Sequence, residues 1–172
     1  MKTKIIIGID PDVKKSGVAI NDKSTGIVSA SSFCFPELLD FLKDVSIRFD
    51  ATIYVEASWL IKKSNFHGGN TSVSSLIAKH VGRNHQTGIL IAEMCKHYGL
   101  NVVEIEPLAK CWKGKDKKIT LDELKRFAKV ELPKKYLKAE LQEMLDAALQ
   151  AYVFTLLSAL FIGQAVEEHD HH

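Results

Sequence analysis

Cysteine is scarce in this sequence of 172 residues, which contains only Cys34, Cys95 and Cys111. Their spacing matches no metal-binding motif, so a cysteine-based metal site is not expected. An odd number of cysteines also argues against a framework of disulfides. We therefore expect reduced thiols and a cytoplasmic protein.

Long apolar runs are missing as well. Lys2 and Lys4 precede only a short apolar stretch before Asp10, which is too short for a signal peptide. The apolar run from Ala147 to Ile162 is interrupted by Gln150 and is shorter than the roughly 20 residues that a membrane span needs. We therefore expect no membrane partner.

The sequence also lacks a strong excess of charge of one sign. Because the net charge is +2, any affinity for nucleic acid has to arise from uneven placement of the basic residues. The length suits one domain with a full-sized core. We expect this domain to span residues 1–163, followed by a disordered polar tail over 164–172 whose histidines and acidic residues could bind metal weakly.

A β-branched run that ends at Pro11 predicts a buried strand at the start of the chain. Because side chains alternate along a strand, Gly8 and Asp10 share one face and three isoleucines share the other. Asp10 thus ends the strand on a face that Gly8 leaves bare, which suits a metal ion and a large ligand. The alternative is that Asp10 caps the next turn, since Asp-Pro commonly opens turns. Residues 17–21 and 27–33 predict two further, antiparallel strands.

A second carboxylate ends another predicted strand. Apolar residues at helical spacing predict a helix from Pro36 to about Phe49, which Asp50 and Ala51 end. Residues 52–56 then form a strand that finishes at Glu56. If this strand runs parallel beside the first, two carboxylates meet at one sheet edge, where they repel unless a cation lies between them. Taken alone, Glu56 could also be a solvated residue at a strand end.

The segment over residues 57–71 is irregular and mixes aromatic with basic side chains. Exposed aromatics among lysines are typical of surfaces that bind single-stranded or unstacked nucleic acid. The alternative is a loop whose aromatics pack back onto the core. The residues concerned are Trp59, Lys62, Lys63 and Phe66.

A long helix is predicted from about Ser72 to Tyr98, with Gly82 and Gly88 inside it. Interior glycines cost a helix about 1 kcal/mol each relative to alanine, so they indicate a close backbone approach or a kink. The polar segment between the two glycines contains Arg83 as a candidate for binding nucleic acid. A fifth strand is predicted over residues 102–105.

Positive charge is concentrated between Lys110 and Lys138, where eleven Lys or Arg accompany four acidic residues. A charge run is usually a solvated face, but its asymmetry also suits contact with phosphates. Thr120 with Glu123 forms a capping box that predicts a helix through Lys129. The candidate phosphate contacts are Lys110, Lys113, Lys115, Lys117 and Lys118.

The last predicted helix runs from Ala139 to about Gly163 and carries two acidic residues on one face, Glu143 and Asp146. Acidic residues near a helix N-terminus complement the helix dipole, which explains Glu143. This explanation suits Asp146 poorly, because its neighbours along the helix are apolar. Asp146 is therefore the stronger candidate for a functional carboxylate.

The motif GIDP-x-x-x-x-SGVA, from Gly8 to Ala19, resembles the opening of the RuvC-type Holliday junction resolvases, which belong to the RNase H-like nucleases. Asp12 stands where that family usually has glycine. The acidic pair before an apolar helix is also similar to the end of the resolvases, with Glu143 in place of an aspartate. The basic segment resembles theirs in its proline, lysine and glycine positions.

This resemblance implies an α/β fold with an RNase H-like mixed sheet of five strands, three antiparallel and then two parallel, and helices on both faces. It implies that Asp10, Glu56, Glu143 and Asp146 hold two Mg²⁺ ions, or Mn²⁺, and cut four-way DNA junctions. The lysines would contact phosphates, and Trp59 or Phe66 would stack on a base. Cutting two opposed strands implies a homodimer. The resemblance also implies that no small-molecule cofactor is needed.

Two other functions are compatible with these residues. One is an RNase H-like nuclease that acts on RNA or flapped DNA with the same carboxylates. The other is a module that binds branched DNA without cutting it. Clustered negative charge close to phosphate argues against the second alternative, since a binding module has no use for it.

Overall fold

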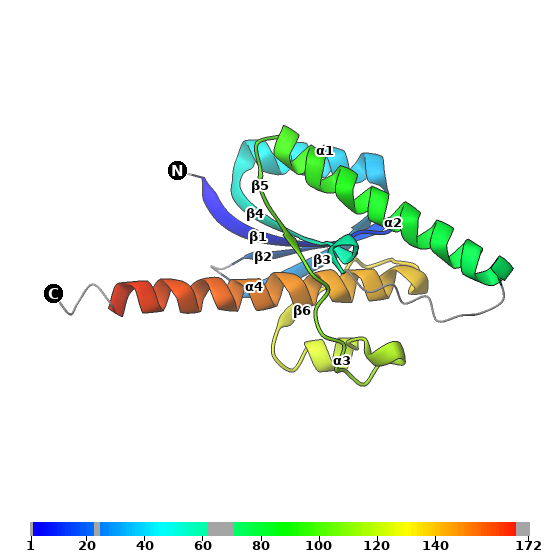
Figure 1. Cartoon of the computed structure of the whole chain (residues 1–172). Helices are drawn as coiled ribbons and strands as arrows, with labels where there is room; N and C mark the ends of the chain where they lie inside the picture. The colour runs from blue at the N-terminus through cyan, green and yellow to red at the C-terminus, as the bar shows by residue number, and fades with distance from the viewer. Residues whose placement is uncertain (1, 23–24, 62–70, 168–172) are drawn as a thin grey trace.

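The computed structural model describes residues 2–22, 25–61 and 71–167 (Figure 1). One mixed sheet has the strand order β5-β4-β1-β2-β3-β6. The first three strands are antiparallel, and β4 and β5 add to β1 in parallel, as expected. The strands are β1 (Thr3–Asp10), β2 (Ser16–Asp22), β3 (Ile27–Phe33), β4 (Phe49–Glu56), β5 (Asn101–Ile105) and β6 (Lys129–Glu131).

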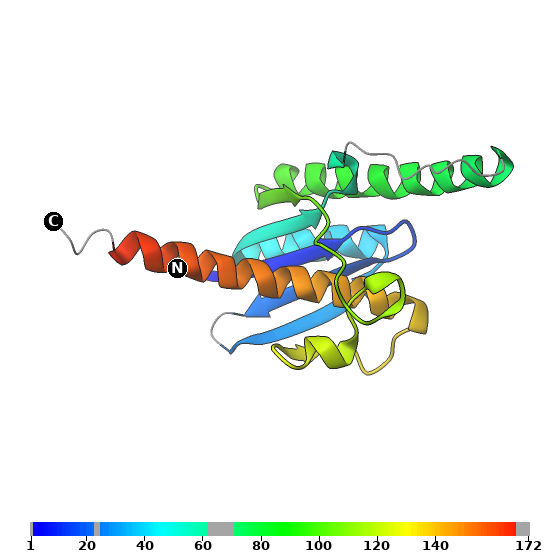
Figure 2. The same ribbon diagram turned by 60° about the horizontal axis from the view of Figure 1, so that its bottom comes forward.

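Helices cover both faces of the sheet, which confirms the expected α/β layers (Figures 1 and 2). One face packs against α1 (Phe35–Arg48) and α2 (Thr71–His97), and the other packs against α3 (Leu121–Leu124) and α4 (Leu141–Glu167). The first turns of α2 and the last turns of α4 extend past the sheet at opposite ends (Figure 2). Within the described ranges, no helix is long and apolar enough to cross a membrane.

The alternation predicted for β1 is confirmed, but the face that Gly8 leaves bare packs against α4. The isoleucines at 5, 7 and 9 are buried in the core beneath α1 and α2. On the other face, a Cβ added to Gly8 would lie only 2.9 Å from the backbone nitrogen of Ala151 and 3.2 Å from Cβ of Gln150. The space that Gly8 leaves bare is therefore filled by α4.

Gly17 likewise lets the first turn of α4 pack closely against the sheet. A Cβ at this position would collide with the backbone of Glu143 and would lie 2.8 Å from the backbone nitrogen of Met144. Because both Gly8 and Gly17 lack a side chain, the acidic first turns of α4 lie directly on the ends of β1 and β2. This contact brings carboxylates from the end of the sequence to those at its start.

The sheet has six strands instead of the expected five. The helix that begins after the Thr120 capping box ends at Leu124 instead of continuing to Lys129. Lys129 begins β6, in which Val130 pairs with Val28 of β3 in parallel. A β-branched residue beside an open strand edge favours sheet over helix here.

Two further boundaries differ from those expected. The helix ends at Arg48, as the prediction of its end near Phe49 requires, but Asp50 and Ala51 already lie inside β4, where buried Ala51 pairs with Ile5 of β1. The alternation of buried residues along β4 thus begins earlier than Thr52. At the other end of the chain, α4 continues past Gly163 to Glu167, and residues 168–172 of the expected polar tail lie outside the described residues.

Candidate active site

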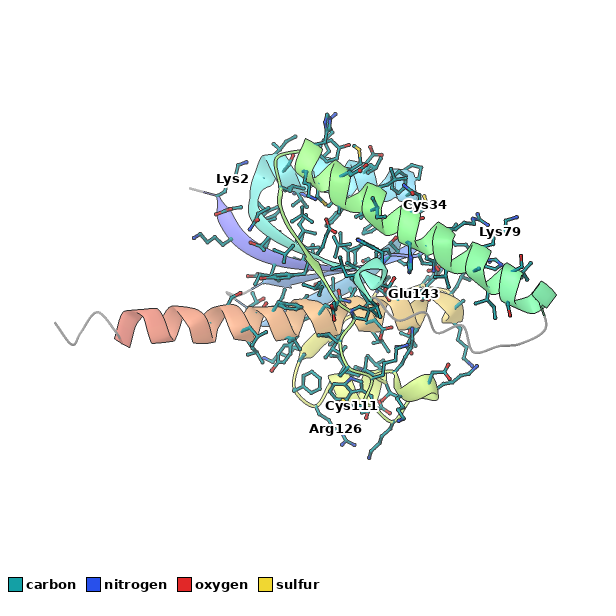
Figure 3. All side chains as sticks on the ribbon, viewed as in Figure 1. Lys2, Cys34, Lys79, Cys111, Arg126 and Glu143 are labelled. Carbon is teal, nitrogen blue, oxygen red and sulfur yellow. The ribbon has the colours of Figure 1, made fainter. Side chains whose placement is uncertain are left out.

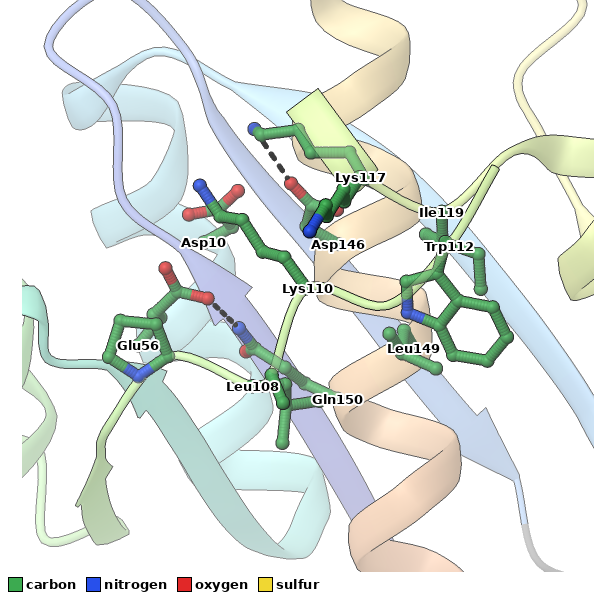
Figure 4. Close-up of a pocket in the computed structure, with 13 residues that line it drawn as sticks. Asp10, Glu56, Leu108, Lys110, Trp112, Lys117, Ile119, Asp146, Leu149 and Gln150 are labelled. Carbon is green, nitrogen blue, oxygen red and sulfur yellow. Dashed lines mark hydrogen bonds and ion pairs between the residues drawn. The ribbon is translucent and has the colours of Figure 1, made fainter. Parts of the chain in front are cut away.

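Asp10 and Glu56 lie at the ends of β1 and β4, which are parallel neighbours in the sheet. Asp146, from the second turn of α4, completes a group of three carboxylates around one pocket (Figure 4). The strand pairing therefore brings together the two residues that the sequence placed at one sheet edge, and α4 adds the third. All three carboxylates are partly buried.

A lysine ammonium is the cation closest to this group. Lys118 Nζ lies 2.9 Å from Asp146 Oδ2, and Gln142 Nε2 donates a hydrogen bond of 2.9 Å to Asp146 Oδ1. Burial lowers the pKa of Lys118, but the bond to Asp146 and the charge of Asp10 outweigh that effect, so the pKa is raised. Lys118 is therefore held in its charged form within the carboxylate group.

One lysine does not neutralise the negative charge of this pocket. Burial raises the pKa of Asp10 well above its usual value, and the charges of Glu56 and Asp146 raise it further. Burial and then the charge of Asp146 also raise the pKa of Glu56, against the lowering effect of its hydrogen bond from Gln150. Carboxylates whose pKa values rise together gain from a further cation.

Glu143, the fourth expected carboxylate, does not line this pocket. It projects from the first turn of α4 (Figure 3) and lines a neighbouring groove with Asp12, Arg83 and Asn84. Burial raises its pKa, and its Oε2 is buried without a hydrogen-bond partner among the described residues. Its charge still reaches Asp10, whose pKa it helps to raise.

Asp12, which departs from the resolvase motif, has a structural role in the turn between β1 and β2. Its Oδ1 accepts a hydrogen bond of 2.8 Å from the backbone N–H of Lys14. Its backbone N–H donates to Ser16 Oγ at 3.2 Å, and Asn84 of α2 donates to its Oδ2 at 3.4 Å. The aspartate thus closes the turn next to Asp10 and ties it to α2.

The structure divides the predicted basic residues into groups. Lys110, Lys117 and Lys118 line the carboxylate pocket, and Lys110 extends into it (Figure 4). Lys113 and Lys115 are exposed outside it. Arg83 is exposed on α2, where it lines the neighbouring groove. Lys62, Lys63 and Phe66 lie outside the described residues.

Trp59 lies in the short turn η1 (Ser58–Leu60) directly after β4, where it packs against the core under α1 and α2. Its Nε1 donates to Glu104 Oε2 at 3.3 Å. A Cβ on Gly88 would lie 2.8 Å from Trp59 Cη2, so this glycine makes room for the indole, as a close approach predicts. At Gly82 no described atom outside the nearby backbone of its own helix lies within 4 Å of such a Cβ, so of the two predicted alternatives the close approach is not found at this glycine.

These contacts favour the interpretation that Trp59 fills space between loop and core, and stacking on a base stays a prediction. We expect Trp59→Ala to lower the free energy of unfolding by about 2–4 kcal/mol, because a half-buried indole and its hydrogen bond are lost. Denaturant unfolding measures this change. A variant of unchanged stability that cuts DNA far more slowly would instead support stacking. Indole fluorescence with DNA should be followed in a Trp112→Phe background, since Trp112 also lines the pocket.

Two glutamines contact the carboxylates and were not among the sequence candidates. Gln142 bonds Asp146, and Gln150 Nε2 donates to Glu56 Oε2 at 2.7 Å (Figure 4). They lie one turn before and one turn after Asp146 on the same face of α4. The sequence signal was available in Gln150, which interrupts an otherwise apolar run.

Among the described residues, no group of three or more His, Cys, Asp or Glu side chains has the arrangement of a formed metal site. The donor set nevertheless fits a hard divalent cation, because the pocket offers carboxylate oxygens and no sulfur or imidazole ligand. Burial and then the charges of neighbouring carboxylates raise the pKa values of Asp10 and Glu56, and a cation in the pocket would offset that repulsion.

Comparison with solved structures identifies the fold. RuvC of Thermus thermophilus in complex with a Holliday junction substrate aligns with a TM-score of 0.53, over 91% of this chain and 96% of that one. The chain has a RuvC-like fold. The two chains are 13% identical, so the likeness concerns the fold alone. A second structure of Thermus thermophilus RuvC aligns with a TM-score of 0.43, at 11% identity over 88% of this chain and 96% of that one.

Sequence comparisons add no family. No protein-family profile matches the chain. A stretch of 31 residues, 18% of this chain, is 71% identical to part of ATP synthase subunit a of Chloroherpeton thalassium (strain ATCC 35110 / GB-78). The matched stretch spans only 9% of the length of that protein.

Proposed function

We propose that this protein is a divalent-metal-dependent endonuclease that cuts four-way DNA junctions. The observation that carries the proposal is the pocket in which Asp10, Glu56 and Asp146 meet beside three lysines. Carboxylates placed next to cations that can bind phosphate have the composition of a phosphodiester-hydrolysing site. The RuvC-like fold adds support, because the aligned RuvC structure contains a Holliday junction substrate.

Asp10, Glu56 and Asp146 would hold the metal, with Glu143 as a further ligand if the first turn of α4 adjusts. A bound Mg²⁺ or Mn²⁺ supplies Lewis-acid stabilisation of charge on the phosphate oxygens and lowers the pKa of a bound water. Glu56 accepts a hydrogen bond from Gln150 at Oε2, whereas both oxygens of Asp146 have partners, Gln142 at Oδ1 and Lys118 at Oδ2. A cation would therefore take the place of Lys118 at Asp146.

The lysines would bind and orient the DNA backbone at this pocket. Lys110 and Lys117 are exposed at its rim, where phosphates approach from solvent. Lys118 lies deeper and is paired with Asp146, so it would release that carboxylate when another cation binds. Two opposed cuts in one junction require two such pockets, so we propose that the protein acts as a homodimer.

The test of the proposal is a cleavage assay on three substrates of equal length: a four-way junction, a linear DNA duplex and an RNA–DNA hybrid. We expect Mg²⁺-dependent cutting of the junction in preference to the other two, and none in EDTA. Preferential cutting of the hybrid would identify an RNA-directed nuclease on the same fold. Tight junction binding without cutting in either Mg²⁺ or Mn²⁺ would identify a binding module and contradict the proposal.

The lysine contacts have a separate signature. We expect Lys110→Ala and Lys117→Ala each to weaken junction binding for all arm sequences and to reduce the slope of log affinity against log salt by about one unit. Fluorescence anisotropy in Ca²⁺ over a range of salt concentrations measures the slope. The control is Lys43→Ala, since Lys43 is exposed on α1, away from the pocket. A slope equal to that of the control would show that neither lysine contacts a phosphate and that both belong to a solvated face.

A further inference from the structure

We propose that Gln150 is the positioning residue for Glu56: its side-chain amide fixes the orientation of this carboxylate toward the metal. The inference rests on the proposed function and adds a residue to it. Gln150 Nε2 donates a hydrogen bond of 2.7 Å to Glu56 Oε2. In Figure 4 the glutamine reaches from α4 to Glu56 at the side of the pocket.

The surroundings of Gln150 show why its amide needs a function. The residue is only 1% exposed and lies in a stretch of α4 whose neighbours Ala147, Leu149 and Ala151 are all buried and apolar. Its Oε1 is buried without a hydrogen-bond partner among the described residues. A buried polar atom without a partner is a cost to stability that an apolar side chain would avoid. The amide is therefore unfavourable for folding except for the one bond it makes to Glu56.

The backbone around Gln150 is built to admit this contact. Gly8 of β1 lies beneath it, and a Cβ on Gly8 would lie 3.2 Å from Cβ of Gln150. The glycine lets α4 approach closely enough for the amide to cross from the helix to the end of β4. Gln142 repeats the arrangement one turn before Asp146, where it donates to Asp146 Oδ1 and also to the carbonyl of Ile119.

Orientation of Glu56 matters because the strand leaves its side chain free. β4 fixes only the backbone of Glu56. The carboxylate, which lines the pocket, can still turn about the side-chain bonds. The single donated bond to Oε2 holds that oxygen on the α4 side and limits rotation of the carboxylate. A preset ligand loses less conformational freedom when the metal binds, so the affinity for the metal rises.

The experiment compares Gln150→Met with the parent, because methionine keeps the length of the side chain and removes the donor. Isothermal titration with Mn²⁺ gives the metal affinity, and thermal melting in EDTA gives the stability. We expect the affinity for Mn²⁺ to fall about 10- to 100-fold, as for other groups that orient a metal ligand. The melting temperature should stay equal or rise, because the unpaired amide oxygen is gone. The combination of a weaker site and an equally stable fold is the signature of a positioning residue.

A matched control is Asn21→Leu. Asn21 is also a buried amide that contacts α4, through Thr155 Oγ1 at 2.9 Å, but it touches no carboxylate. Its replacement should leave the affinity for Mn²⁺ unchanged whatever it does to the stability. Gln150→Leu serves as a second variant if the methionine variant does not fold, and circular dichroism establishes folding of each.

The outcomes separate this inference from the proposed function. If the parent binds Mn²⁺ and Gln150→Met or Gln150→Leu binds it equally well, Gln150 is not a positioning residue and the proposed function stands. A lower melting temperature together with unchanged affinity would assign the glutamine a structural role and overturn the inference. If the parent itself binds no Mn²⁺, the proposed function fails and the inference fails with it.

Discussion

Asp146→Asn should abolish junction cleavage while the protein stays folded and still binds junctions. The substitution keeps the shape of the side chain, but an amide nitrogen, which only donates, replaces one of the two oxygens that accept from Lys118 and Gln142. It removes the negative charge that a divalent cation requires. Loss of about 3–4 kcal/mol of stabilisation of the transition state corresponds to a rate lower by roughly two to three orders of magnitude. Binding should be equal or slightly tighter, because less negative charge repels the phosphates.

Single-turnover cleavage in Mg²⁺ measures the rate, and anisotropy in Ca²⁺ measures the binding. The matched control is Asp40→Asn, which removes an exposed carboxylate on α1 and should cut at the rate of the parent. If Asp146→Asn also cuts normally and still requires metal, Asp146 is not part of the site. Loss of junction binding together with cleavage would instead show that Lys118 needs its partner in order to bind DNA.

The parts of the fold that the sequence predicted are those set by short-range patterns. The alternation along β1, the break at Pro11 and the turns between the first strands are local, and all reappear in the structure. The parallel pairing of β1 with β4 follows because a helix connects the antiparallel strands to β4. The sixth strand could not be predicted in the same way, because three residues of β6 form a strand only beside the open edge of β3.

The candidate site was predictable in its backbone positions but not in its side-chain partners. Spacing on a helix places Glu143 and Asp146 on one face. In the structure, however, Asp146 lines the carboxylate pocket and Glu143 lines the neighbouring groove. Which of the lysines meets Asp146 depends on the path of the chain from β5 to α3. That path includes left-handed backbone at Asp116 and Lys117, with φ of 56° and 58°. Neither residue is glycine, so no sequence signal marked the turn.

The use of Gly8 shows how one residue allows two interpretations from sequence alone. A missing side chain beside a strand-end carboxylate is compatible with an approaching ligand or with an approaching helix. The sequence does not say which of the two fills the space, because the filling helix comes more than a hundred residues later. The helix that fills it is α4, whose own Asp146 then completes the carboxylate group.

The protein should become more stable without metal when Asp10 is replaced by asparagine. Burial and the charges of Glu56 and Asp146 raise the pKa of Asp10 well above its usual value, so its charged form is unfavourable in the folded state. The folded state therefore binds more protons than the unfolded state between the two pKa values. Stability contributed by protonated Asp10 is present below the unfolded pKa of about 3.8 and is lost as the pH rises through the folded pKa.

Asp10→Asn removes this penalty, so its advantage over the parent should be small near pH 4 and should grow toward neutral pH. For a chain of this length, each kcal/mol changes the melting temperature by about 2–4 °C. We expect a rise of about 3–6 °C at pH 7.5 in EDTA, together with loss of junction cleavage. The measurement is a series of melting curves from pH 4 to 8 for the variant and the parent, with Asp40→Asn as the control for loss of one exposed charge.

Addition of Mg²⁺ or Mn²⁺ should then reverse the order of the two proteins. A cation that binds only the folded parent stabilises it in proportion to the logarithm of its concentration above the Kd, whereas Asp10→Asn lacks a ligand and gains less. A variant that is less stable than the parent at every pH in EDTA would show that the carboxylates of the pocket do not repel one another. In that case the charge of Lys118 alone balances the pocket, and the reason for a metal ion at this edge of the sheet disappears.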